Sequence, residues 1–214
     1  IVGNWGLNTR LKATSDEPIT LYSNDFDDNG TIDPVITYFY QKQETPFASK
    51  DELVKQIPFL NKKFLSYKDF AEASFTELLP KDKINGAFKK QVFELGSSYF
   101  ENQGGNTFKK HQLPFMAQIS SVNDIAVDDF NNDGYTDVLL VGNNYNINTQ
   151  LGKLDASHGL ILLNDKKGFF HESLPQDFNI SGEARNIETI KIKGELFYII
   201  SINNDIPVFL KANK

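Results

Sequence analysis

The feature that most constrains the fold is a repeated segment in which a short acidic loop precedes an apolar run. NDFDDNGTIDPVITYF begins at Asn24, and DDFNNDGYTDVLLVGN begins at Asp128. A second match joins VGNWGLNT, at Val2–Thr9, to VGNNYNINT, at Val141–Thr149. Internal repeats of this kind are typical of architectures built from repeated supersecondary units. We therefore expect an all-β repeat fold.

The spacing of the copies indicates where extra residues have been added. The loops Asp25–Asp33 and Asp129–Asp137 begin about 104 positions apart, and a degraded third copy, Ile192–Asp205, follows the second loop by about 62. A period near 60 suits a four-stranded propeller blade with long connections. We therefore predict that residues 1–214 are a segment of one β-propeller domain, and that one blade carries an α-helical insertion at 46–98.

The insertion contains three helical patterns, which predict a lid or a side decoration on the blade. Ser49–Glu52 is a capping-box motif, and Pro58 should bend or split the helix that follows because proline lacks an amide donor. Ser66 offers a second helix start, and a third helix is expected at about 84–100. Strand patterns return in SYFENQGGNTFKKHQLP, whose Gly-Gly turn separates two alternating runs.

Both acidic loops place side-chain oxygens at alternating positions, as a cation site requires. Positions 1, 3, 5 and 9 hold Asp25, Asp27, Asn29 and Asp33 in the first loop, and Asp129, Asn131, Asp133 and Asp137 in the second. Glycine at position 6 permits a sharp turn, and the carbonyl of position 7, Thr31 or Tyr135, can add an oxygen. Calcium accepts such a ligand set more readily than magnesium, which needs strict octahedral geometry. We therefore expect two calcium ions.

Two alternatives to this interpretation can be weighed from the residues. The loops are not EF-hands, because position 12 holds Ile36 or Leu140 in place of a bidentate Glu and the flanks are rich in strand-forming residues. Ordinary turns are the second alternative, since Asp, Asn and Gly favour tight turns without any metal. Two copies at matching offsets favour the metal, because a cation would relieve the repulsion between the carboxylates.

Composition excludes several classes of function. A net charge of −6 and a pI near 5.1 argue against nucleic-acid binding, which needs a cationic face. The absence of cysteine removes disulfides, thiolate metal sites and cysteine nucleophiles. No apolar stretch approaches the length of a transmembrane helix. Because the chain opens at Ile1 without an initiator Met, we expect it to be a segment of a longer polypeptide.

The acidic segments NDFDDNGTIDPVI and DDFNNDGYTDVLLVGN resemble the FG-GAP, or VCBS, repeats of integrin-type β-propellers. With the helical insertion and the ENQGGNTFKKHQLP strand pair, the chain is similar to the carboxy-terminal part of bacterial cartilage-acidic-protein-like (ASPIC/UnbV-type) proteins of Bacteroidota. The resemblance implies a partial propeller of about three FG-GAP-type blades, with calcium held by the two loops. The third copy has lost its carboxylates around Lys191–Leu196, so no ion is expected there.

The resemblance also implies partners and a place of action. Three blades cannot close a ring, so we expect the remaining blades of a larger propeller or other subunits of a surface complex. The implied function is a calcium-stabilised extracytoplasmic module for binding or scaffolding, either secreted or at the outer-membrane surface, where a lipoprotein anchor would hold it. Extracellular calcium is millimolar, which matches sites of modest affinity. The bound partner would be a protein or a glycan.

Other polar clusters leave two alternatives open. Asparagines near Trp5 and Tyr145 could line a glycan-binding face, although turn chemistry also accounts for them. A propeller-based polysaccharide lyase or hydrolase is the alternative function, and Asp155, Ser157 and His158 form its nominal triad. Residues so close on one short loop rarely converge as a triad must, so we expect a turn there, no catalytic residues and no enzyme.

Overall fold

The computed structural model describes residues 1–173 and 178–212, and the chain forms two compact units. Unit 1 comprises Ile1–Arg10 and Leu95–Lys214, and unit 2 comprises Leu11–Glu94. The structure is mostly β, with four antiparallel sheets in the described part of the chain. Among the described residues, no helix is long and apolar enough to cross a membrane.

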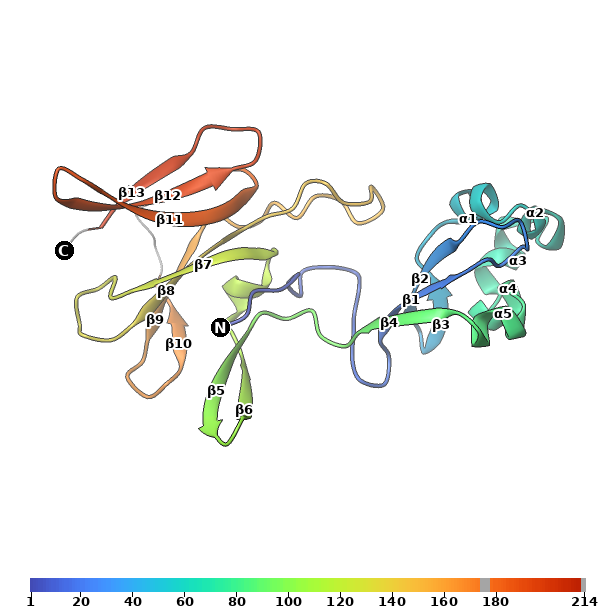
Figure 1. Ribbon diagram of the computed structural model, residues 1–214, viewed down its shortest axis with the longest axis horizontal. Helices are drawn as coiled ribbons and strands as arrows, with labels where there is room; N and C mark the ends of the chain where they lie inside the picture. The colour runs from blue at the N-terminus through green and yellow to red at the C-terminus, as the bar shows by residue number, and fades with distance from the viewer. Residues whose placement is uncertain (174–177, 213–214) are drawn as a thin grey trace. The chain divides into compact units, whose positions relative to one another are not determined.

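Unit 2 is built on one four-stranded antiparallel sheet (Figure 1). Its strands are β1 (Ile19–Asn24), β2 (Asp33–Tyr40), β3 (Gln43–Pro46) and β4 (Phe88–Val92), in the order β3-β2-β1-β4. Buried and more exposed residues alternate along β2, as expected for a sheet with one covered face. Tyr22 and Val35, which are paired across β1 and β2, lie on that covered face.

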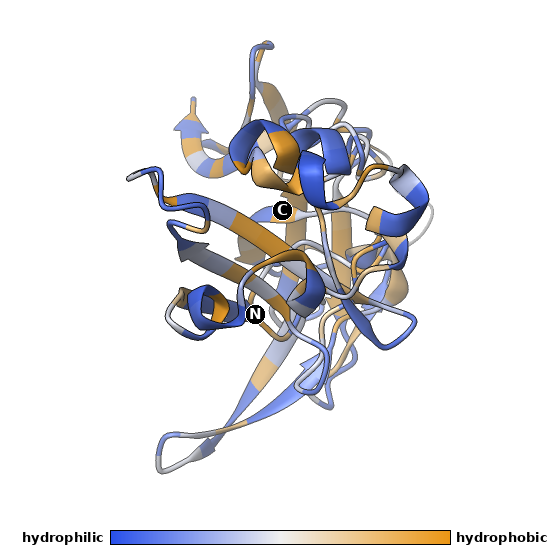
Figure 2. Ribbon diagram, turned by 90° about the vertical axis from the view of Figure 1, so that its right-hand side faces the viewer, coloured by the Kyte–Doolittle hydropathy of each residue, from blue (hydrophilic) through white to orange (hydrophobic). Residues whose placement is uncertain are grey.

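Five short helices between β3 and β4 supply most of the core of unit 2. They are α1 (Lys50–Gln56), α2 (Phe59–Lys63), α3 (Tyr67–Glu72), α4 (Phe75–Leu78) and α5 (Lys81–Asn85). The capping box of Ser49 and Glu52, the break at Pro58 and the cap at Ser66 are confirmed. Hydrophobic and hydrophilic residues alternate along the helices (Figure 2), and the apolar ones, such as Leu60, pack against the covered face of the sheet.

The third predicted helix, at 84–100, is wrong. Helix α5 ends at Asn85, Gly86 caps it, and Phe88–Val92 forms strand β4 instead. This strand pairs antiparallel with β1 from Ser23↔Phe88 to Ile19↔Val92. The edge of β1 offers ladder hydrogen bonds to the segment, and this long-range pairing overrides a local helical pattern. The helical part of the 46–98 insertion is therefore confined to residues 50–85.

Unit 1 contains the other three sheets and a short 3₁₀ helix. A four-stranded sheet in the order β10-β9-β8-β7 contains β7 (Val122–Asp128), β8 (Asp137–Gly142), β9 (Leu160–Asn164) and β10 (Phe170–Glu172). A three-stranded sheet contains β11 (Ala184–Ile192), β12 (Glu195–Ile202) and β13 (Val208–Lys211). The predicted hairpin is confirmed as β5 (Ser98–Gly104) and β6 (Thr107–Gln112), and Phe115–Gln118 form the 3₁₀ helix η1.

Strand β8 is buried along its whole length because both of its faces are covered. Leu139 and Val141 pack toward the three-stranded sheet, in a cluster that includes Ile200. Val138 and Leu140 point to the other face, in a cluster that includes Leu162. After Asp137, the run VLLVG is therefore continuously apolar, where a half-exposed strand would alternate.

The degraded third copy forms strand β12, as expected, but it lacks the acidic loop. Strands β11 and β12 pair up to Ile192↔Glu195, so only Lys193 and Gly194 connect them. Both residues have positive φ angles, 53° and 86°, as a tight two-residue hairpin turn requires. A two-residue turn therefore stands where the other copies carry a nine-position loop.

Candidate metal sites

The two acidic loops occupy equivalent places in two different sheets. The first joins β1 to β2 in unit 2, and the second joins β7 to β8 in unit 1. Their backbones match at the positions where conformation is most restrictive: φ is 58° at both Asp28 and Asn132, position 4, and 85° and 87° at Gly30 and Gly134, position 6. Glycine adopts such angles without steric cost, which explains its place in both copies.

The hydrogen bonds inside the loops also repeat. Asp25 accepts from the backbone N–H of Asn29 at 3.0 Å and from that of Gly30 at 2.8 Å. Asp129 accepts the same two bonds in the second loop, also at 3.0 and 2.8 Å. These bonds turn the position-1 carboxylate toward the inside of each loop, which is compatible with a tight turn as well as with a metal site.

Positions 5 and 9 follow the same pattern. At position 5, Asn29 Oδ1 accepts from the N–H of Thr31 at 2.7 Å, and the matching bond from Tyr135 to Asp133 is 3.0 Å. At position 9, Asp33 Oδ2 accepts from the backbone N–H of Phe26 at position 2, with a distance of 3.1 Å. In the second loop, Asp137 Oδ2 accepts the equivalent bond from Phe130 at 3.0 Å. The two predicted ligand sets therefore have one shared framework.

The first loop brings three carboxylates together. One oxygen from each of Asp25, Asp27 and Asp33 lies within 4.8 Å of the others, and no other group of three potential acidic, His or Cys ligands converges in this way among the described residues. Asp33 is almost fully buried, with 2% of its surface exposed. This geometry fits a hard cation, because a positive charge between oxygen ligands at short distance would remove their mutual repulsion.

The pKa values of two carboxylates in the first loop change in opposite directions. Burial raises the pKa of Asp33, and the neighbouring carboxylates of Asp27 and Asp25 raise it further, although a hydrogen bond from the Phe26 amide opposes the change. A hydrogen bond from the Gly30 amide lowers the pKa of Asp25. Asp33 is thus the carboxylate that gains most from a nearby cation.

In the second loop, two carboxylates interact with protein groups outside their own position: Asp137 with backbone N–H groups and Asp133 with a lysine. Asp137, which is fully buried, accepts from the Asn164 amide at Oδ1 (2.8 Å) and from the Phe130 amide at Oδ2 (3.0 Å). Asp133 Oδ2 lies 3.3 Å from the Lys166 ammonium group. Burial alone would raise the pKa of Asp133, but hydrogen bonds from the Tyr135 amide and Lys166 outweigh it and lower the pKa.

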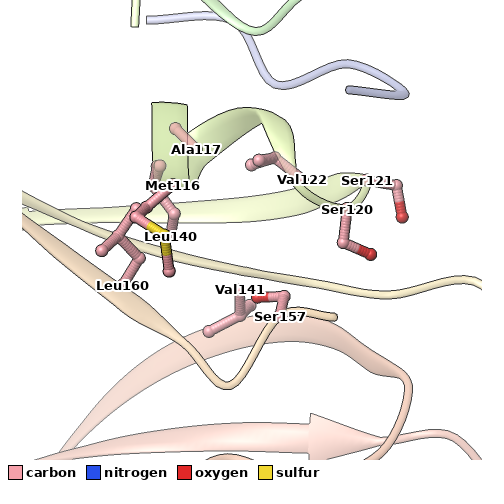
Figure 3. A pocket seen from close by; sticks show the side chains of 9 residues that line it. All are labelled: Met116, Ala117, Ser120, Ser121, Val122, Leu140, Val141, Ser157 and Leu160. Carbon is pink, nitrogen blue, oxygen red and sulfur yellow. The ribbon is translucent and has the colours of Figure 1, made fainter. Parts of the chain in front are cut away.

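Ser157 and His158, two members of the nominal triad, take part in hydrogen bonds that involve their backbone groups. Ser157 is held by Asn143, which accepts its N–H at 2.9 Å and donates to its carbonyl at 2.8 Å. The Ser157 hydroxyl accepts from the Gly159 N–H at 3.4 Å, and the His158 carbonyl accepts from the Ile180 N–H at 2.9 Å. A small pocket of about 10 Å³ beside Ser157 is lined mostly by apolar residues such as Met116, Leu140 and Leu160 (Figure 3).

Two features of unit 1 were not predicted from the sequence. One is a cavity of about 130 Å³ between the β5–β6 hairpin and the turn before β10, lined by Tyr99, His111 and Phe170 among others. The other is the nearly buried carboxylate of Glu183, which accepts hydrogen bonds from Tyr145, Arg185 and Asn203. Both features bring together segments that lie far apart in the chain, so no local sequence pattern indicated either of them.

Comparisons with known proteins identify one part of the chain. No curated protein and no solved structure matches the sequence. Residues 121–154 match the FG-GAP repeat family. This stretch spans β7, the second acidic loop and β8, and it continues to Leu154, which forms an isolated bridge with Asn144. The chain therefore contains an FG-GAP repeat, centred on one of its two acidic loops.

Proposed function

We propose that this chain is a calcium-stabilised extracytoplasmic β-propeller module that binds or scaffolds a protein partner or a glycan at a bacterial cell surface. The observation that carries the calcium part is the convergence of Asp25, Asp27 and Asp33 in a loop whose backbone repeats in the FG-GAP segment. The ligands would be the predicted side chains with the Thr31 carbonyl in the first loop and the Tyr135 carbonyl in the second.

Calcium would act on stability in this proposal. Each loop joins two neighbouring strands of a sheet, and its position-9 carboxylate is the first residue of the second strand. A cation that binds both ends of the loop would fix the two strands relative to each other and remove the repulsion between the carboxylates. Ligands that bind only the folded state stabilise it by about 2.7 kcal/mol at a concentration of 100 times Kd.

The second face of the unit 2 sheet supports the partner proposal. Ile36, Phe88 and Val92 lie on that face and are exposed by 46%, 59% and 45%. Exposed apolar residues gathered on one sheet face are characteristic of surfaces that pack against another element. A neighbouring blade of a larger propeller would cover this face, as blades of that architecture pack face to face.

The test of the calcium proposal is thermal unfolding in calcium and in chelator. Millimolar calcium should raise the melting temperature of the wild-type chain, and D27N combined with D129N should remove most of the increase. D16N, which removes an exposed carboxylate outside both loops, should leave the increase intact. Equal melting temperatures with and without calcium in the wild-type chain would refute the proposal.

A further inference from the structure

We infer that the two loops are unequal cation sites, and that Lys166 is an internal cation that competes with calcium for the second loop. The inference rests on the proposed calcium function. In the structure, the Lys166 ammonium group lies 3.3 Å from Asp133, the position-5 ligand, and 5.1 Å above the ring of Tyr135, the position-7 residue. A positive charge therefore already stands beside two of the five positions that would bind the ion.

The sheet itself places Lys166 there. Asn164, the last residue of β9, donates its backbone N–H to Asp137 at 2.8 Å and its side-chain amide to the Thr136 carbonyl at 3.2 Å. Its side-chain oxygen accepts from the Lys166 N–H at 2.8 Å, and Lys166 takes a φ of 67°. The turn that carries the lysine is thus tied to the position-9 residue of the loop.

The first loop has no such arrangement. Strand β3 pairs with β2 only from Thr37 to Tyr40, so the third strand does not reach Asp33 at the start of β2. Lys83, a lysine beside the first loop, forms an ion pair with Asp28, which is position 4 and not a predicted ligand, and its charge also acts on Asp25 at position 1. The ion-paired partner of Lys83 therefore lies outside the ligand set, whereas the ion-paired partner of Lys166 lies within it.

These differences predict an order of filling. Asp137 already has a backbone partner at each oxygen, and Asp133 has a lysine partner, whereas three carboxylates of the first loop converge. The first loop should bind calcium more tightly than the second. Because the Lys166 side chain is 52% exposed, it is a weak competitor, and its removal should tighten calcium binding at the second loop by about three- to fivefold.

Terbium luminescence can report the second loop selectively. Tyr135 is at position 7 of that loop, whereas the first loop has Thr31 there, so excitation of tyrosine should sensitise terbium mainly in the second loop. The Y135F variant keeps the backbone carbonyl and identifies the signal. Calcium is then added to displace terbium from the wild-type chain and from the K166Q, K166R and K167Q variants. Lys167, the adjacent exposed lysine, is the matched control for net charge.

Each outcome decides the inference. A three- to fivefold lower calcium concentration for half-displacement in K166Q, with K166R and K167Q like the wild type, supports it. An unchanged or weaker K166Q, or an equal change in K167Q, overturns it while the calcium proposal stands. A wild-type signal no greater than that of a Y135F/Y198F variant shows that the second loop binds no ion, because Tyr198 also lies beside this loop and donates to Asp128. That result overturns this inference and, for that loop, the proposed function as well.

Discussion

The nearly buried carboxylate of Glu183 offers a sharp test of how unit 1 is held together. Only 2% of the residue is exposed. Its Oε1 accepts from the Tyr145 N–H at 2.9 Å and from Arg185 at 2.5 Å, and its Oε2 accepts from the Asn203 side-chain amide at 2.6 Å. Glu183 thus joins the segment after β8, the start of β11 and the end of β12.

The magnitude follows from these three bonds. A hydrogen bond to a charged group contributes about 1.5–3 kcal/mol, and Glu183→Gln replaces one acceptor oxygen by an amide that faces a donor, so we expect a loss of about 2 kcal/mol. Glu183→Ala leaves the Tyr145 N–H and the Asn203 amide without a charged acceptor, whereas Arg185, whose side chain is 43% exposed, can turn to water, and we expect a cost of about 2–4 kcal/mol.

The dependence on pH has a definite sign. Burial alone would raise the pKa of Glu183, but hydrogen bonds from Asn203 and the Tyr145 amide and the charge of Arg185 outweigh it and lower the pKa. A lowered pKa in the folded state means that the stabilisation is complete above the ordinary glutamate pKa. It is lost as the pH falls through the folded-state value.

Urea denaturation followed by tryptophan fluorescence is the appropriate assay, because the single tryptophan, Trp5, belongs to unit 1. Glu188→Gln, an exposed change on β11, is the control and should alter the free energy of unfolding by less than about 0.5 kcal/mol. If Glu183→Ala were no more destabilising than this control, or if it kept the acid sensitivity of the wild type, the reasoning would be refuted.

Two further substitutions test the packing of each unit. Gly142→Ala would place a Cβ only 1.6 Å from the Ser121 carbonyl oxygen, so the backbone must shift; we expect at least about 3 kcal/mol of destabilisation in the same urea assay, and a change below about 1 kcal/mol would contradict this close approach. Leu60→Ala removes a fully buried side chain from the core of unit 2 and should cost about 2–5 kcal/mol, measured by calorimetry; a melting profile like that of the wild type would show that the helices do not form this core.

Local signals explain the parts of the structure that the sequence predicted. The capping box at Ser49 and the break at Pro58 depend on residues within one helical turn, so neither needs knowledge of distant contacts. The acidic loops are equally local: glycine at position 6 and short polar side chains at alternating positions define their backbone, and the two copies agree within a few degrees at Gly30 and Gly134. The FG-GAP match at residues 121–154 covers one of these local patterns.

Contacts between segments far apart in the chain explain the parts of the structure that the sequence did not predict. The run from Phe88 to Val92 reads as helical in isolation, but it becomes a strand because the edge of β1, about 70 residues earlier, is open to pairing. The engagement of Asp133 by Lys166 also depends on which turn the sheet brings beside the loop. The β1 partner of Phe88–Val92 and the Lys166 partner of Asp133 both depend on the fold, so local residue spacing cannot predict either of them.

The placement of β4 shows why the helices cannot be a mere decoration of the sheet. Strand β3 ends at one edge and β4 pairs at the other, so the chain between Pro46 and Phe88 must cross three strand spacings, about 14 Å. The helices make this crossing on the face that contains Tyr22 and Val35, and they bury it with their own apolar residues. The four-stranded sheet of unit 1, whose strands follow one another in sequence order, has one face covered by a second sheet instead. The helical segment therefore covers one face of the unit 2 sheet, as the three-stranded sheet covers one face of the four-stranded sheet in unit 1.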